Sequence, residues 1–212
     1  MNRPLLFCAA LALATTAALA EPTPPPPGFV IPHGGKDVTK AIAGDYTLDG
    51  NHIGLVARVS HMGFSISIFR FEKVSAKLTW DPKAIDKSQL SATVETASIT
   101  SNVPGFAADL AGPKYLNAGQ FPQATFVSTG FKKLSATHGK VTGDFTLKGK
   151  TKPMTFDVTL VGAGPGFAGS PVMGHVLGIH AEGAINPQDF DMGPFFKDPI
   201  QLVIDTEFDR KP

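Results

Sequence analysis

Residues 141–160 read VTGDFTLKGKTKPMTFDVTL. On both sides of the turn at 149–153, apolar side chains occur at every second position. They are Val141, Phe145, Leu147, Met154, Phe156, Val158 and Leu160. A period of two places such residues on one face of a β-strand, whereas the 3.6-residue repeat of a helix would scatter them. The stretch therefore predicts a β-hairpin with one apolar face and one polar face.

The same alternation extends along most of the chain. Strands are predicted at 44–49, 52–61, 64–80, 89–97, 123–133, 138–148, 152–161, 175–186 and 199–208. The segment 101–120 interrupts the pattern, because Val103, Phe106 and Leu110 follow helical spacing and Pro113 ends the run. Strands joined mostly by short turns favour an all-β antiparallel barrel over a sandwich, with this segment as a short helical insertion.

The N-terminus has the features of an export signal followed by a linker. Arg3, the apolar run 5–13 and Ala18-Leu19-Ala20 are typical of a secretory signal peptide, residues 1–20, cleaved near Ala20. Residues 21–42 are rich in proline and predict an extended tether. The folded domain is expected to span residues 43–212.

The amino-acid composition argues against some binding partners and some kinds of functional site. The chain has 19 basic and 18 acidic residues, a balance that argues against nucleic acid as a partner. Its one cysteine, Cys8, lies in the predicted signal peptide, so we expect no disulfide, thiolate metal site or cysteine nucleophile after cleavage. Sixteen Phe residues indicate either a generous core or a lined cavity.

Motifs for catalysis are missing from the sequence. The six histidines show no recognised zinc spacing, and there is no G-x-S-x-G motif or phosphate-binding glycine loop. We therefore predict no metal site, no catalytic residue and no enzyme activity. One alternative is an enzyme that acts on a lipid or small apolar substrate with His61 or His52, paired with Asp49, as acid and base. Another is an outer-membrane barrel, which the single Trp and two Tyr disfavour because such barrels carry aromatic girdles.

The strand predicted at 52–61 ends in a histidine on its apolar face. Ile53, Leu55, Ala57 and Val59 share their parity with His61. One interpretation is a core histidine that hydrogen-bonds a neighbour. The other is a polar group at the end of an apolar channel, the arrangement expected for a ligand with a long apolar tail.

Several short motifs follow one another in a fixed order. They are Tyr46-Thr47-Leu48-Asp49, His52, Leu55, Val59, His61-Met62-Gly63, Phe71, Ser98-Ile99-Thr100, Leu110, Tyr115-Leu116, Phe121-Pro122, Phe126, Ser128, Gly143, Phe145 to Pro153, Ile185-Asn186 and Asp189-Phe190. With these motifs the chain resembles the YceI-like family of polyisoprenoid-binding periplasmic proteins from Tyr46 to Phe208. The turn Gly149-Lys150-Thr151-Lys152-Pro153 is the most specific of them.

The resemblance implies a lipocalin-like antiparallel barrel of about eight strands that holds an isoprenoid lipid in its lumen. It also implies a periplasmic location and a homodimer. No cofactor is expected besides the bound lipid, and transient contact with a membrane is expected. The leading hypothesis is therefore a non-catalytic protein that carries or sequesters a polyprenyl or quinone tail, whose burial contributes about 0.8 kcal/mol per methylene.

The ligand-binding lumen is predicted by extending the parity of each strand and taking the more apolar parity as the inner one. Phe106 and Leu110 of the insertion complete the set. The insertion, including Leu116, is expected to cover one mouth of the barrel. The predicted residues are Ile53, Leu55, Ala57, Val59, His61, Phe64, Ile66, Ile68, Val94, Phe106, Leu110, Phe126, Phe145, Leu147, Met154, Phe156, Val158, Leu202 and Ile204.

Three positions depart from the family pattern. Ala57 stands where the family tends to have a bulky aromatic residue, Phe69 where it tends to have Gly, and Pro187 where it tends to have Arg. Ala57 should widen the lumen at its level, provided that Phe69 does not fill the space.

Overall fold

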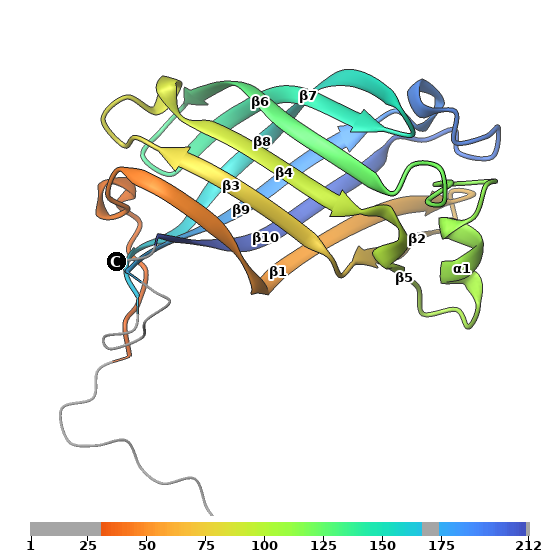
Figure 1. Ribbon diagram of the computed structural model, residues 1–212, viewed down its shortest axis with the longest axis horizontal. Coiled ribbons are helices and arrows are strands. Elements are labelled where there is room, and N and C mark those ends of the chain that lie inside the picture. The colour runs from red at the N-terminus through yellow and green to blue at the C-terminus, as the bar shows by residue number, and fades with distance from the viewer. Residues whose placement is uncertain (1–30, 167–173, 211–212) are drawn as a thin grey trace, which may run out of the picture. The chain divides into compact units, whose positions relative to one another are not determined.

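The computed structural model describes residues 31–166 and 174–210, which form an antiparallel β-barrel (Figure 1). The predicted signal peptide and the first part of the predicted tether lie outside the described residues. The strands are β1 (Gly44–His61), β2 (Ser65–Phe71), β3 (Val74–Trp80), β4 (Gln89–Glu95), β5 (Ile99–Thr100), β6 (Gln123–Lys133), β7 (His138–Leu147), β8 (Lys150–Pro165), β9 (His175–Ile185) and β10 (Ile200–Arg210).

The barrel closes between its first and last strands. The strand order is β10-β9-β8-β7-β6-β4-β3-β1, and β10 pairs back onto β1. β3 and β2 follow one another along the same edge of β1, where β3 pairs with residues 44–47 and β2 with residues 55–61. The predicted single strand at 64–80 is thus two strands broken at Glu72 and Lys73. Counted as one position, they give the eight-stranded antiparallel barrel that was predicted.

Short helices lie at the ends of the barrel. The α-helix α1 (Phe106–Ala111) lies in the predicted insertion and marks what we call the α1 end (Figure 1). The 3₁₀ helices are η1 (Val38–Lys40), η2 (Ile85–Lys87), η3 (Thr96–Ser98) and η4 (Pro187–Phe190). Among the described residues, no helix is long and apolar enough to span a membrane.

The predicted hairpin at 141–160 is formed by β7 and β8. Val141 pairs with Phe156 and Gly143 with Met154, so the apolar parity of both strands faces the core. The turn is shorter than predicted, because only the residues at 148 and 149 leave the ladder and both have positive φ, as a two-residue hairpin turn requires. A Cβ at Gly143 would lie 2.5 Å from the Phe126 ring, so this glycine makes room for an aromatic core residue.

The ordered fold begins earlier than the predicted boundary at residue 43. Gly35 forms a β-bridge with Ala163, and Ala41 is fully buried. The indole Nε1 of Trp80 donates a hydrogen bond to the Ala41 carbonyl at 3.1 Å. The prolines of this segment indicate an extended linker, but Val38 and Ala41 supply apolar side chains that pack against the barrel.

Candidate ligand-binding site

Two cavities lie inside the barrel. The larger has a volume of about 220 Å³, and the smaller, on the α1 side, has a volume of about 90 Å³. Five residues line both cavities, and we call them the neck. They are Leu55, Val94, Ala124, Phe145 and Leu202. The two cavities therefore follow one another along a single lumen.

Apolar side chains from β1, β3, β4 and β6 to β10 line the larger cavity. Val38 of η1 and Ile85 of η2 contribute at the end away from α1. Most polar residues of the lining belong to the β6–β7 hairpin. They are Lys132, Lys133, Ser135, Thr137, His138 and Lys140. The larger cavity thus has an apolar interior and a polar, basic rim.

The helical insertion forms one side of the smaller cavity. Leu110, Tyr115 and Leu116 line it, as does Phe196 from the β9–β10 loop. The ring centroids of Tyr115 and Phe196 are 5.6 Å apart, so the insertion and this loop pack on each other. Phe106 lies outside the lining and packs on Phe69 at a centroid distance of 6.0 Å. The insertion thus lies over the end of the lumen that contains the smaller cavity, as expected for a segment that covers one mouth of the barrel.

Most of the predicted lumen residues line one cavity or both. They are Ile53, Leu55, Ala57, Val59, Val94, Leu110, Phe126, Phe145, Leu147, Phe156, Val158, Leu202 and Ile204. Phe106 and Met154 belong to the same hydrophobic core without lining a cavity. Contact between these side chains and a ligand stays a prediction.

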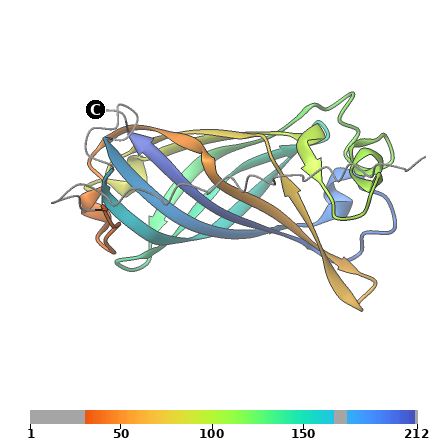
Figure 2. The same cartoon turned by 90° about the horizontal axis from the view of Figure 1, so that it is seen from below.

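The inward orientation predicted for Ile66 and Ile68 is wrong, and His61 and Phe64 are exposed at the end of the hairpin instead of lining the lumen. In the β1–β2 register Ala57 faces Phe69, so the odd-numbered residues of β2 share the inner face and Ile66 and Ile68 point outward. The more apolar parity is the outer one here because the hairpin projects past the end of the barrel (Figure 2). Phe64 near its tip is 86% exposed, and His61 is exposed as well.

The histidines of the enzyme hypothesis lie outside the lumen. His61 is exposed, and His52 meets Asp49 on the outer surface, with 2.5 Å between His52 Nδ1 and Asp49 Oδ2. The predicted pairing of His52 with Asp49 therefore exists, but neither residue lines a cavity. An acid and base acting on a substrate held in the lumen would have to come from other residues.

Sequence reasoning missed several residues of the lining, and those of β3 and β9 are the clearest examples. Leu78, Trp80, Leu177 and Ile179 line the larger cavity. The alternation along 76–80 and 177–181 carries the signal that could have identified them.

A model of the YceI-like domain family matches residues 46–208. This chain belongs to the YceI-like family. Protein YceI of Escherichia coli O157:H7 is 34% identical over 173 residues, which cover 79% of this chain and 87% of that protein. Protein YceI of Salmonella arizonae matches with the same identity and coverage.

Two solved structures share the fold of this YceI-like chain. Burkholderia cenocepacia BcnA superposes with a TM-score of 0.66 at 23% identity, over 76% of this chain and 98% of that one. A domain of Saccharophagus degradans, described as a polyisoprenoid binding domain implicated in plant cell wall breakdown, gives a TM-score of 0.51 at 10% identity, over 79% and 98%.

Two positions at which this YceI-like chain is expected to depart from its family pattern lie side by side. Ala57 and Phe69 are direct partners in the β1–β2 ladder, and both line the smaller cavity. The Phe69 side chain is buried and lies across the ladder from the single methyl group of Ala57. The wider lumen at Ala57 stays a prediction, and the structure places the aromatic ring of Phe69 on the neighbouring strand beside it.

Proposed function

We propose that this protein is a non-catalytic periplasmic carrier that holds an isoprenoid lipid, a polyprenyl or quinone tail, in its barrel lumen. One observation carries the proposal: two apolar cavities follow one another along the barrel and share the neck residues. A long, narrow apolar space suits a chain rather than a compact ligand. Such a ligand needs few directed polar contacts, because each buried methylene contributes about 0.8 kcal/mol.

A structural neighbour and the N-terminal sequence also support the proposal. The polyisoprenoid-binding description belongs to the Saccharophagus degradans domain, and the chain shares that fold. The signal-peptide features of residues 1–20 support export to the periplasm.

Trp80 offers a direct assay. It is the only tryptophan of the sequence, and it lines the larger cavity. We expect a prenylated quinone to quench its fluorescence with a saturable dependence on concentration, while the same quinone ring without a tail does not. Equal quenching by both compounds would contradict binding through the tail.

A variant at the neck tests whether the two cavities act as one site. Ala124 lines both cavities and has the smallest side chain of the neck. Ala124→Phe should weaken binding of a long prenyl chain and leave binding of a short one nearly unchanged. Because both ligands are measured on the same variant, any loss of stability affects them equally. Equal weakening of both would show that the cavities are not used in series.

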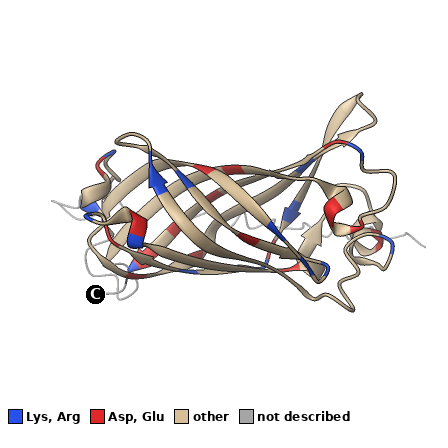
Figure 3. Cartoon of the chain, turned by 90° about the horizontal axis from the view of Figure 1, so that it is seen from above, with Lys and Arg blue, Asp and Glu red and all other residues tan. Residues whose placement is uncertain are grey.

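We propose that the projecting β1–β2 hairpin contacts the membrane from which the lipid is taken. Met62, Phe64, Ile66 and Ile68 are its exposed apolar residues. Residues 56–71 include Arg58, His61 and Arg70 but no Asp or Glu, and the tip carries no charged residue (Figure 3). An apolar tip with basic residues behind it suits an anionic lipid surface.

Vesicles test this contact. Replacing Phe64 and Ile68 with Ser should lower co-sedimentation with phosphatidylglycerol vesicles and slow lipid uptake from them, without changing binding of a detergent-dispersed prenyl lipid. Val127→Ser is the control, since Val127 is an equally apolar, exposed residue of the barrel wall. Unchanged co-sedimentation of the hairpin variant would contradict the contact.

The homodimer that the resemblance implies stays a prediction. Sedimentation equilibrium of the purified chain measures it, and a monomer mass at micromolar concentration would contradict it.

A further inference from the structure

β1 contains a bulge opposite β10 at a position where the sequence indicated a turn. Leu48 pairs with Phe208 and Ile53 with Thr206, so the four residues 49–52 stand opposite Glu207 alone. The bulge brings Asp49 and His52, three positions apart in the sequence, onto the outer face of the barrel beside Glu207. Histidine spacing along the chain gives no sign of this grouping, because its members come from two strands.

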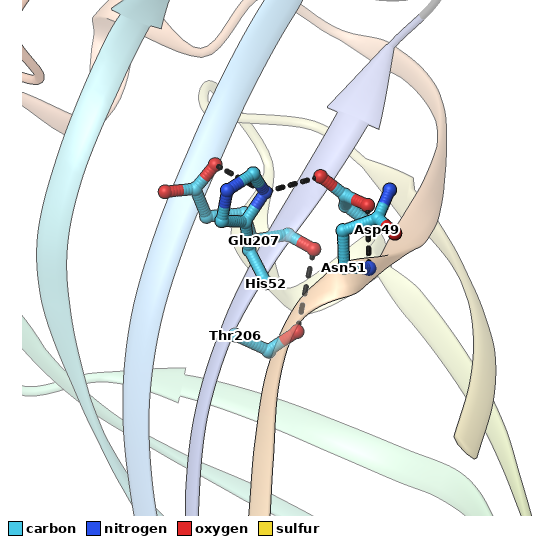
Figure 4. A network of polar contacts seen from close by, with 5 residues as sticks. All are labelled: Asp49, Asn51, His52, Thr206 and Glu207. Carbon is cyan, nitrogen blue, oxygen red and sulfur yellow. Dashed lines mark hydrogen bonds and ion pairs between the residues drawn. The ribbon is translucent and has the colours of Figure 1, made fainter. Parts of the chain in front are cut away.

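His52 lies between two carboxylates (Figure 4). Its Nδ1 is 2.5 Å from Asp49 Oδ2 and 4.0 Å from Glu207 Oε2. One ligand atom from each of the three residues lies within 4.8 Å of the other two. The Asp49 side chain is only 9% exposed, and its Oδ1 accepts a hydrogen bond from the Asn51 amide at 2.8 Å. The nearly buried carboxylate of Asp49 and the half-buried carboxylate of Glu207 thus share a single imidazole, that of His52.

A fourth group, Asp209, adds a buried carboxylate with an unused oxygen. The residue is 7% exposed, and its buried Oδ1 has no hydrogen-bond partner. Asp209 lies two residues beyond Glu207 on β10, so its side chain leaves the strand on the same outer face. Its ladder partner Thr47 lies two residues before Asp49.

A buried carboxylate without a donor is unfavourable unless a cation compensates it. His52 alone supplies at most one positive charge to three carboxylates. Among the described residues, no Lys or Arg forms an ion pair with any of the three. A divalent ion would offset the negative charge of these carboxylates and remove the repulsion between them.

We propose that Asp49, His52 and Glu207 bind a divalent transition-metal ion of the zinc class, and that the buried Asp209 beside them adds negative charge to the site. Two carboxylates and one imidazole supply three ligands, the number of protein ligands in zinc sites that keep an open position. The imidazole nitrogen favours zinc over calcium or magnesium, which prefer oxygen ligands. The ion would join the bulge of β1 to β10 on the outside of the barrel, apart from the lumen.

The same face of the barrel provides a matched control. His180 lies 2.7 Å from Asp205 and 3.3 Å from Glu182, so it too lies between two carboxylates. Both of these carboxylates are more than 60% exposed and can be solvated by water. We expect no tight metal site there.

Calorimetry on the full purified chain, freed of metal with EDTA and dialysed, tests the site with zinc chloride as the probe. We expect one zinc ion per chain, no heat from calcium or magnesium chloride, and a higher thermal midpoint with zinc. Asp209→Asn and His52→Gln should each lower zinc affinity by at least about tenfold. Asp205→Asn and His180→Gln should leave it unchanged.

Asp209→Asn also separates loss of the site from loss of the fold. Without metal it should unfold at a higher temperature than the wild type, because it removes an uncompensated buried charge, and zinc should no longer raise its midpoint. The absence of zinc binding by the wild type, wild-type affinity in Asp209→Asn, or an equal loss in Asp205→Asn would each overturn the proposal.

Discussion

Ala57 and Phe69 show how two neighbouring residues share one space. Phe69 occupies the position beside Ala57 across the ladder, so a second ring at 57 would overlap with it. We expect Ala57→Phe to destabilise the barrel by about 1–3 kcal/mol. Phe69→Gly should cost about 3–5 kcal/mol, the range for loss of a buried aromatic.

The double variant Ala57→Phe with Phe69→Gly moves the aromatic ring from β2 to β1 and places a glycine opposite it. It should be more stable than the sum of the single losses by about 0.5–3 kcal/mol. Urea denaturation of the four proteins measures this coupling. Additive losses would show that the two side chains do not share one space.

His180 should make stability depend on pH. The hydrogen bond with Asp205, and to a lesser extent Glu182, raises the pKa of His180. The folded state therefore holds the proton more tightly than the unfolded chain does. The stabilisation is fully present below the unfolded pKa of about 6.5 and is lost as the pH rises through the folded pKa.

The comparison with His180→Gln isolates this contribution. The difference in unfolding free energy between wild type and variant should shrink from pH 6 to pH 9, as measured by urea denaturation across that range. A difference that stays constant over the range would rule out a raised pKa at this residue.

The insertion that contains α1 is an element whose packing should control ligand exchange. Leu110 lines the smaller cavity, and Phe106 anchors the insertion on Phe69. Replacing Phe106 and Leu110 with Ser should speed dissociation of a prenyl lipid about tenfold, equivalent to about 1.4 kcal/mol of lost packing. Stopped-flow fluorescence measures the rate. The exposed Ala108→Ser serves as the control, and an unchanged rate in the double variant would argue against a lid.

The secondary-structure elements differ in how much of their orientation can be predicted from their own sequence. The β7–β8 hairpin could be predicted because alternation and turn chemistry agree: Phe145 and Phe156 face the core, and Gly149 takes the positive φ that the turn needs. The orientation of β2 could not, because Ile66 and Ile68 are more apolar than the serines of the inner face. Choosing the more apolar parity as inner holds only where a strand is backed by the core.

The bulge of β1 illustrates a second limit. Asp49-Gly50-Asn51 has the composition of a turn, and only pairing with β10 shows that the strand continues through it. The cluster formed by Asp49, His52, Glu207 and Asp209 therefore depends on a register that the sequence does not encode locally. The predicted lumen does not have this limit, since parity along single strands identifies most of its lining.

At the scale of the whole molecule, the barrel joins two cavities into one lumen. Short helices lie at one end of this lumen and the helical insertion lies at the other. Val38 and Ile85 lie at one end, and the insertion with Leu110 and Leu116 lies at the other. The neck between them is lined by apolar side chains. This arrangement supports the central claim that the molecule holds a chain-like lipid along its lumen.

Mass spectrometry of organic extracts tests that claim most directly. The protein would be isolated from its native host without detergent and compared with Ala124→Phe, whose neck should admit less of a long chain. The account predicts that a long-chain isoprenoid lipid co-purifies with the wild type in near-stoichiometric amount and is depleted from the variant. A wild-type protein that carries no such lipid, and takes up none when prenyl lipids are supplied, would contradict it.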